Sequence, residues 1–373
     1  MAKRILMMIA LSIFGVLALL GILEVGLRWW FDTRGSEQEK ALYLYDRATI
    51  DARTAQLIGV PYLNFTLNPD WQDVNERGIR GELVAVPKPA GVYRILALGG
   101  STTFGHALSA EESWPAQLQR ILRDEYGYTQ VEVVNLGVPG YYSLDSVVSL
   151  ATRGLMHQPD LIMDYDNLND AVIRIYQDPA CYSGDTPLYG FGMDRGIWQA
   201  AGAELPSSTL YRFVAYRLGW MDDPLAVNSR MEHTGWCPPE PGNVSQLNLL
   251  ASNPPVHFER NLRSIAALAE SGGAQVLFST YAWDRAAAES LLEADSSLDG
   301  TRALMMAIDE QNTLIQSIAA DTGALVFDLA AQMTDGAYFQ GDQVHQTAEG
   351  ARRQAELYAQ FLHEWGGIKS AES

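Results

Sequence analysis

The sequence predicts an α/β fold with a doubly wound parallel sheet in three layers, preceded by one transmembrane helix. Short apolar runs typical of buried strands alternate with helical patterns through most of the chain after residue 90. Polar or glycine-rich turns follow the first three of these runs, and this order of strand, turn and helix builds parallel sheets. A separate apolar segment near the amino terminus is long enough to cross a membrane.

The transmembrane prediction rests on residues 5–27, in which only Ser12 and Glu24 are polar. A helix of about twenty apolar residues spans a bilayer, so we assign residues 1–31 to a membrane anchor. A cleaved signal peptide fits less well, because the run is too long and no small-x-small cleavage site follows it. Glu24 could face a partner or the lipid headgroups, and snorkelling near the interface explains it most simply.

The flanking residues predict the orientation of this helix. Lys3 and Arg4 precede it, and Trp29 and Trp30 follow it. Basic residues favour the cytoplasmic side and tryptophans favour the interface. We therefore expect a cytoplasmic amino terminus, with the rest of the chain outside the cytoplasm.

Composition excludes one class of partner. The 373 residues carry a formal net charge of −19, and 47% of them are hydrophobic. This length suffices for one large domain or two small ones. Nucleic acid is not an expected partner, because phosphate binding needs a basic surface.

Cys181 and Cys237 are the only two cysteines. Outside the cytoplasm such a pair favours a disulfide, and two unrelated buried thiols are the alternative. No metal site is expected here, because neither cysteine has a close Cys or His partner at ligand spacing.

Domain organisation follows from the change in pattern along the chain. Residues 32–90 contain several prolines and little periodicity, which indicates a stalk and an amino-terminal extension. Residues 91–366 carry the α/β pattern, interrupted by an insertion at about 172–253 that is rich in Gly and Pro. Such a segment is either a lid or binding loop over the site or a structural cap without substrate contact.

The elements of the α/β region follow in order. The first strand, 93–98, ends at two glycines, and the helix after it places Trp114, Leu118 and Ile121 on one face. The helix before the fourth strand has Leu262, Ile265 and Leu268 in register. The predicted strands are 93–98, 131–136, 159–165, 274–280 and 324–328, and the predicted helices are 113–124, 144–155, 258–269, 301–321 and a last helix ending at Leu362.

Polar residues gather where the strands end or the last helix begins. They include Ser101, Gly137, Asn169 and the pair Asp342 and His345. Because the carboxyl ends of parallel strands meet at one edge of the sheet, we expect these residues to lie close together. Together they are the parts of a serine hydrolase site. A base must activate the serine hydroxyl, an aspartate orients that base, and N–H donors stabilise the oxyanion.

Four motifs resemble the SGNH (GDSL-like) hydrolase family. They are Leu98-Gly99-Gly100-Ser101-Thr102-Thr103-Phe104-Gly105, Asn135-Leu136-Gly137-Val138-Pro139-Gly140, Asn167-Leu168-Asn169-Asp170 and Asp342-Gln343-Val344-His345. No single motif is specific, but all four occur in the expected order and context. The chain departs from the family pattern at two positions. The first motif has Gly-Gly-Ser where the family usually has Gly-Asp-Ser, and the third motif has Asn167 where the family usually has a glycine.

The resemblance implies the SGNH, flavodoxin-like sandwich and a role for each matching residue. Ser101 is the expected nucleophile, His345 its base and Asp342 the orienting partner. The backbone amides of Ser101 and Gly137 and the side chain of Asn169 form the expected oxyanion hole. The layout also resembles bacterial members anchored in the inner membrane with a periplasmic or extracellular domain.

We therefore expect an ester hydrolase that forms an acyl-enzyme, with no cofactor and no metal. By family analogy its substrates are acyl esters of envelope glycans or lipids. An O-acyltransferase with the same triad is a close alternative. Another alternative is a non-catalytic scaffold subunit that binds a membrane-protein partner.

Asp160, Asp164 and Asp166 alternate along the end of one predicted strand. Such a set of carboxylates could suggest a metal site, but it is more often a solvated strand end.

Overall fold

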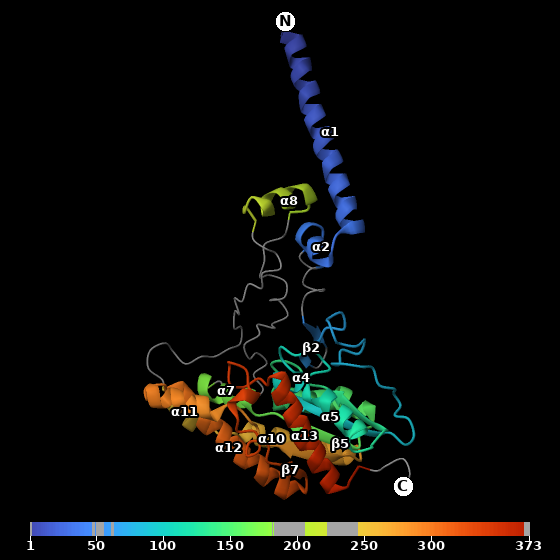
Figure 1. The fold of residues 1–373 in the computed structure, drawn as a ribbon. Helices are drawn as coiled ribbons and strands as arrows, with labels where there is room; N and C mark the ends of the chain where they lie inside the picture. Colours follow the sequence, from blue (N-terminus) through green and yellow to red (C-terminus); the bar gives the residue numbers. More distant parts are fainter. Residues whose placement is uncertain are drawn as a thin grey trace. The chain divides into compact units, whose positions relative to one another are not determined.

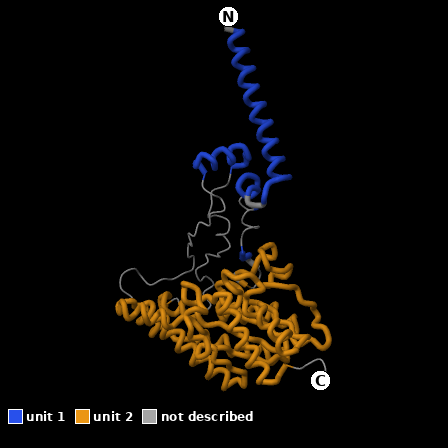
Figure 2. Tube along the Cα trace, in the orientation of Figure 1, with its two compact units in different colours: residues 1–58, 193–232 blue, residues 59–192, 233–373 orange. Residues whose placement is uncertain are grey.

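The computed structural model describes residues 2–46, 49, 56–60, 63–180, 182, 206–221 and 245–368. The chain divides into two compact units, coloured separately in Figure 2. Unit 1 comprises residues 1–58 and 193–232, and unit 2 comprises residues 59–192 and 233–373. Cys181 and Cys237 fall outside the described residues, so their disulfide stays a prediction.

The described part of unit 1 includes helices α1 (Ala2–Arg34), α2 (Glu37–Tyr43) and α8 (Thr209–Arg217). Among the described residues, α1 alone is long and apolar enough to cross a membrane, judged by length and composition. Phe31 of α1 packs against Tyr43 of α2 and Phe213 of α8, with ring centroids 4.6 and 6.0 Å away. These aromatic contacts join α1, α2 and α8, whose ribbons are labelled in Figure 1.

Unit 2 is built on five parallel strands in the order β4-β3-β5-β6-β7. This order places the first and third strands along the chain side by side, at the switch point where doubly wound sheets bind ligands. All five predicted strands are present, with ends within two residues of the prediction. Their bounds are β3 Tyr93–Gly99, β4 Val131–Asn135, β5 Leu161–Tyr165, β6 Gln275–Ser279 and β7 Leu325–Phe327.

Both faces of the sheet are covered, which confirms the three-layer prediction. Ile95 and Ala97 of β3 face one apolar cluster, shared with α5 and α13. Leu96 and Leu98 face the other cluster, shared with α10. The alternation follows from the two-residue period of a strand. The helices are α5 Trp114–Asp124, α6 Ser143–Ser149, α7 Leu168–Tyr176, α9 Gln246–Ser252, α10 Val256–Ser271, α12 Asp299–Thr322 and α13 Ala348–Trp365.

The structure differs from the predicted elements in several places. The helix predicted over 144–155 is α6 followed by a π-helical turn, Leu150–Gly154, and a 3₁₀ turn, Leu155–His157. Helix α7 continues past residue 172, where the insertion was expected to begin. Short elements that were not predicted include β1 (Leu57–Val60), β2 (Leu63–Leu67), α4 (Ser101–Phe104), α8 and α9 within the expected insertion, α11 (Arg285–Ala294) and the 3₁₀ turn Gly336–Tyr338.

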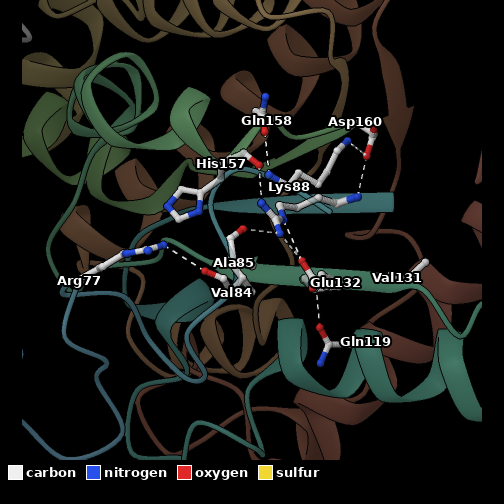
Figure 3. Close-up of polar contacts among 12 residues, drawn as sticks. Arg77, Val84, Ala85, Lys88, Gln119, Val131, Glu132, His157, Gln158 and Asp160 are labelled. Atoms are coloured by element: carbon white, nitrogen blue, oxygen red, sulfur yellow. Dashed lines mark hydrogen bonds and ion pairs between the residues drawn. The ribbon is translucent and has the colours of Figure 1, made fainter. Parts of the chain in front are cut away.

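A buried arginine stabilises the amino-terminal edge of the sheet. Arg94 of β3 is fully buried and donates to the Glu132 carboxylate of β4 at 2.5 and 2.9 Å. It also donates to the carbonyl oxygens of His157 and Ala85. In Figure 3, Lys88 reaches toward Asp160, and this ion pair is 2.5 Å long. This edge lies at the opposite end of the strands from Ser101.

Candidate active site

The turn after β3 presents Ser101 at the carboxyl edge of the sheet. Gly99 has φ +144°, and a Cβ there would lie 2.4 Å from Oγ1 of Thr103 and 2.9 Å from the Tyr165 carbonyl oxygen. Only glycine fits this position. The short helix α4 (Ser101–Phe104) begins immediately afterwards and ends at Gly105, which is left-handed with φ +83°. The serine therefore lies on a tight strand-to-helix turn, as the sequence predicted.

The structure brings Ser101, His345 and Asp342 together. Nε2 of His345 lies 2.8 Å from Oγ of Ser101, and Nδ1 of His345 lies 2.6 Å from Oδ2 of Asp342. The other carboxylate oxygen of Asp342 accepts the N–H groups of Val344 and His345 at 3.1 and 3.0 Å. An imidazole held in this way can remove a proton from the hydroxyl while the carboxylate fixes its tautomer.

Hydrogen bonding keeps Asp342 ionised. Burial by itself raises the pKa of this carboxyl group. The bonds from the His345 ring and from the N–H groups of His345 and Val344 outweigh burial and lower the pKa below its ordinary value. Asp342 therefore carries the negative charge that stabilises a protonated His345.

His106 lies beside the three residues, although the sequence did not mark it as part of the site. Its ring packs on that of His345, with centroids 4.6 Å apart and planes at 41°. Burial, and then the neighbouring His345, lower the pKa of His106. Gln340 links the two segments, because its side chain donates to the His106 carbonyl oxygen and its N–H to that of His345. In the sequence, the only indication that His106 belongs to the site was its position five residues after Ser101.

Asn169 lies at the start of α7, beside the Ser101 turn. Its Nδ2 donates to the Tyr141 carbonyl oxygen at 2.7 Å. A Cβ at Gly100 would lie 3.1 Å from that Nδ2 and 3.2 Å from the same carbonyl oxygen. The amide has a second hydrogen, so the bond to Tyr141 orients the group and leaves one donor beside Ser101.

Gly137 plays a different part from the one predicted. Its N–H donates to Oδ1 of Asn135 at 2.9 Å, and Nδ2 of Asn135 donates to the Thr103 carbonyl oxygen. A Cβ at Gly137 would lie 2.4 Å from the Phe104 nitrogen. The residue thus lets the second turn pack closely under α4, while its N–H is already used by Asn135.

Gly140 offers an N–H group in the same turn. Its φ is +84°, and it precedes Tyr141, whose carbonyl oxygen lies beside Gly100. Among the residues that the structure describes, no protein acceptor takes the N–H of Gly140 or of Ser101.

Asn167 does not require the conformation that favours glycine. Its φ is −177°, which is extended backbone open to any residue. The side chain is buried, and Nδ2 donates to Oδ1 of Asn312 on α12 at 3.0 Å. The substitution of asparagine for the usual glycine therefore serves packing between α7 and α12.

Four aspartates are buried near the end of β5: Asp145, Asp164, Asp166 and Asp170. The expectation of a solvated strand end was wrong for Asp164 and Asp166, because α6 and α10 cover that face. Asp160 is partly buried and pairs with Lys88. Burial raises the pKa of all four buried groups. Within the described ranges, no group of three or more His, Cys, Asp or Glu residues could hold a metal ion.

Comparison with known families identifies the group to which this chain belongs. The model of the GDSL-like lipase/acylhydrolase family matches residues 97–353. The chain belongs to this family. The match contains all four motifs, and it confirms the predicted SGNH (GDSL-like) hydrolase that acts on ester bonds.

Solved structures of SGNH hydrolases are similar at low identity. The lipase/acylhydrolase from Enterococcus faecalis is 15% identical, with 74% of this chain and 97% of that chain covered and a TM-score of 0.43. The acetylxylan esterase Axe2 from Geobacillus stearothermophilus is 16% identical, with 74% and 94% covered and a TM-score of 0.42. A comparison with curated proteins found no match.

Proposed function

We propose that this SGNH hydrolase is a membrane-anchored serine esterase that acts outside the cytoplasm through an acyl-enzyme on Ser101. The observation that carries the proposal is the continuous hydrogen-bonded chain from Ser101 through His345 to Asp342. Helix α1 is the proposed anchor, and residues 91–366 are the proposed catalytic domain with its insertion. The proposed substrates are acyl esters of envelope glycans or lipids.

In the proposed reaction, Oγ of Ser101 attacks the ester carbonyl carbon and His345 takes the hydroxyl proton. The oxyanion accepts hydrogen bonds from the N–H of Ser101 and from Nδ2 of Asn169. We assign the third donor to the N–H of Gly140, because Asn135 already accepts that of Gly137. His345 returns the proton to the leaving alcohol, and then activates the water that releases the acid.

The assembled triad favours catalysis over the scaffold alternative. A structural subunit has no need to hold an imidazole between a hydroxyl and a carboxylate, with the carboxylate kept ionised by three hydrogen bonds. The acyltransferase alternative uses the same triad, with a sugar hydroxyl in place of the water.

Labelling with a fluorophosphonate probe tests the proposal. We expect wild type to react and both Ser101→Ala and His345→Ala to lose labelling. Ser264→Ala, which removes an exposed hydroxyl on α10, is the matched control and keeps full labelling. Failure of the folded wild type to react with fluorophosphonates of several sizes would favour the scaffold.

A further inference from the structure

Glu24, the acidic residue within the apolar segment, forms hydrogen bonds with the start of α8, a helix of the insertion. Glu24 accepts hydrogen bonds from the N–H groups of Thr209 and Leu210, at 3.0 and 2.8 Å, and from the Ser208 hydroxyl at 2.9 Å. The first N–H groups of a helix have no partner inside it, and a negative charge there is favourable. Glu24 thus caps α8, which lies about 185 residues later in the sequence.

Two arginines complete this contact within unit 1. Arg28, one turn after Glu24, pairs with it at 3.3 Å and donates to the Ser207 carbonyl oxygen at 2.6 Å. Arg212 of α8 is buried and donates to the carbonyl oxygens of Ala41 and Tyr45, at the end of α2, at 2.7 and 2.6 Å. Helices α1, α2 and α8 are therefore held together by polar bonds at helix ends.

The position of Glu24 along α1 indicates how deep in the membrane its contact with α8 would lie. A helix rises about 1.5 Å per residue, so Lys3 and Glu24 are separated by roughly 30 Å along the axis. The hydrocarbon core of a bilayer is about as thick. With Lys3 at the cytoplasmic boundary, Glu24 lies at the outer boundary and Trp29 and Trp30 lie in the outer headgroup region, where tryptophan is favoured.

The face of α8 that points away from α1 and α2 is apolar and exposed. Tyr211, Val214 and Leu218 follow the spacing of one helical face and are 52%, 40% and 54% exposed. Trp220, just beyond the helix, is 71% exposed. The opposite face, represented by Arg212, is buried. An apolar surface of this kind beside a membrane-spanning helix is typical of a helix that lies in the interface.

A cavity and the distribution of charge agree with lipid as the neighbour. The three helices border an open cavity of about 620 Å³, lined mainly by apolar side chains that include Ile22, Leu27 and Phe213, with Glu39 and Arg217 as its charged members. Unit 1 has 11 basic and 11 acidic residues in its sequence, so the whole net charge of −19 belongs to unit 2. Unit 1 is therefore the part of the chain that an anionic membrane surface does not repel.

We propose that α8 is a second membrane contact, an interfacial helix docked on α1 by Glu24, with its exposed face and the neighbouring cavity filled by lipids of the outer leaflet. The inference rests on the proposed role of α1 as a transmembrane anchor. It adds that the insertion returns to the membrane surface, so the anchor and part of the insertion form one membrane-bound unit.

Nitroxide accessibility in the full chain tests the proposal. Single cysteines replace Leu17 in α1, Val214 in α8 and Val256 in α10, in a Cys181→Ser/Cys237→Ser background with retained labelling by the fluorophosphonate. The protein is reconstituted in vesicles of phosphatidylcholine and phosphatidylglycerol. We expect labels at 17 and 214 to be more accessible to oxygen than to a water-soluble nickel chelate, and the label at 256 to show the reverse. Val256 is the matched control, because it is a helical valine of unit 2 that is 52% exposed.

The outcomes separate this proposal from the one on which it rests. A lipid-exposed label at 17 with a water-exposed label at 214 overturns the interfacial helix and leaves the anchor intact. A label at 214 shielded from both reagents indicates a protein partner and also overturns it. A water-exposed label at 17 removes the anchor itself. Glu24→Ala should return the label at 214 to water while the label at 17 stays in lipid.

Discussion

Nε2 of His345 lies 2.8 Å from Oγ of Ser101, although 244 residues separate them in the sequence. Ser101 reaches this position from the end of β3, and His345 from the loop that precedes α13. The N–H groups of Val344 and His345 donate to Asp342 and hold that loop around it, so the imidazole of His345 is already oriented toward Ser101. The edge of the sheet therefore positions Ser101, and a loop held by its own hydrogen bonds to Asp342 positions His345.

Asp342→Asn should lower kcat on a small ester such as p-nitrophenyl acetate by about 10⁴-fold, as the loss of the orienting carboxylate does in other triads. The amide has the same shape but cannot fix the productive tautomer of His345. Ser101→Ala should cost about 10⁶-fold, and the double variant should be no worse than Ser101→Ala alone. Additive losses in the double variant would contradict a single catalytic unit.

Asn169→Ala should reduce kcat by about 10²- to 10³-fold with little change in KM, because it removes the proposed oxyanion donor, which would act mainly in the transition state. Steady-state kinetics of the variant and wild type measure both constants. A rise in KM with kcat unchanged would instead assign Asn169 to substrate binding.

Asn167→Ala is the matched comparison two residues earlier. It should leave kcat within a few-fold of wild type, because the side chain bonds α12 and not the region beside Ser101. It should lower the free energy of unfolding by about 1–2 kcal/mol, since Asn312 and the neighbouring backbone lose a buried partner. Chemical denaturation in detergent measures this loss, and a large drop in kcat without destabilisation would place the side chain in the site.

The sheet and the contact among Ser101, His345 and Asp342 were predictable because each depends on local pattern and chemistry. Buried parallel strands are continuous apolar runs, and an aspartate three residues before a histidine can form the observed loop. The role of Gly137 was not predictable, because it depends on the side chain of Asn135 folding back over its own turn. The partner of Glu24 was equally hidden, since nothing in the apolar segment indicates a contact with a helix about 185 residues away.

Arg94→Leu should lower the free energy of unfolding by about 3–5 kcal/mol, because it leaves the partly buried Glu132 and two carbonyl oxygens without their partner. At a temperature where the variant is folded, kcat should be unchanged, since this network lies at the end of the strands opposite Ser101. Arg352→Leu, on the exposed face of α13, is the control and should cost less than 1 kcal/mol. Equal losses in the two variants would show that burial of Arg94 adds nothing.

The buried aspartates should make the protein less stable as pH rises from about 4 to 7. Burial raises the pKa of Asp145 to about 7 and that of Asp170 to about 6, whereas an aspartate in the unfolded chain titrates near 4. The folded state therefore holds these protons more tightly. Their stabilising contribution is complete below about pH 4 and is lost as pH rises through the folded pKa. For Asp145 alone this loss is of the order of 4 kcal/mol.

His157 acts in the opposite direction over the same range. Burial, and then the charge of Arg94, lower its pKa to about 4, so the folded state loses stability as pH falls from about 6.5 to 4. Because several carboxyl groups oppose one imidazole, we expect a net decrease of unfolding free energy with rising pH in denaturation experiments from pH 4 to 8. Asp145→Asn, which keeps an oxygen to accept the Tyr142 N–H, should flatten this dependence, and the exposed control Asp124→Asn should not. An unchanged slope in Asp145→Asn would mean that this carboxyl group is ionised in the folded protein.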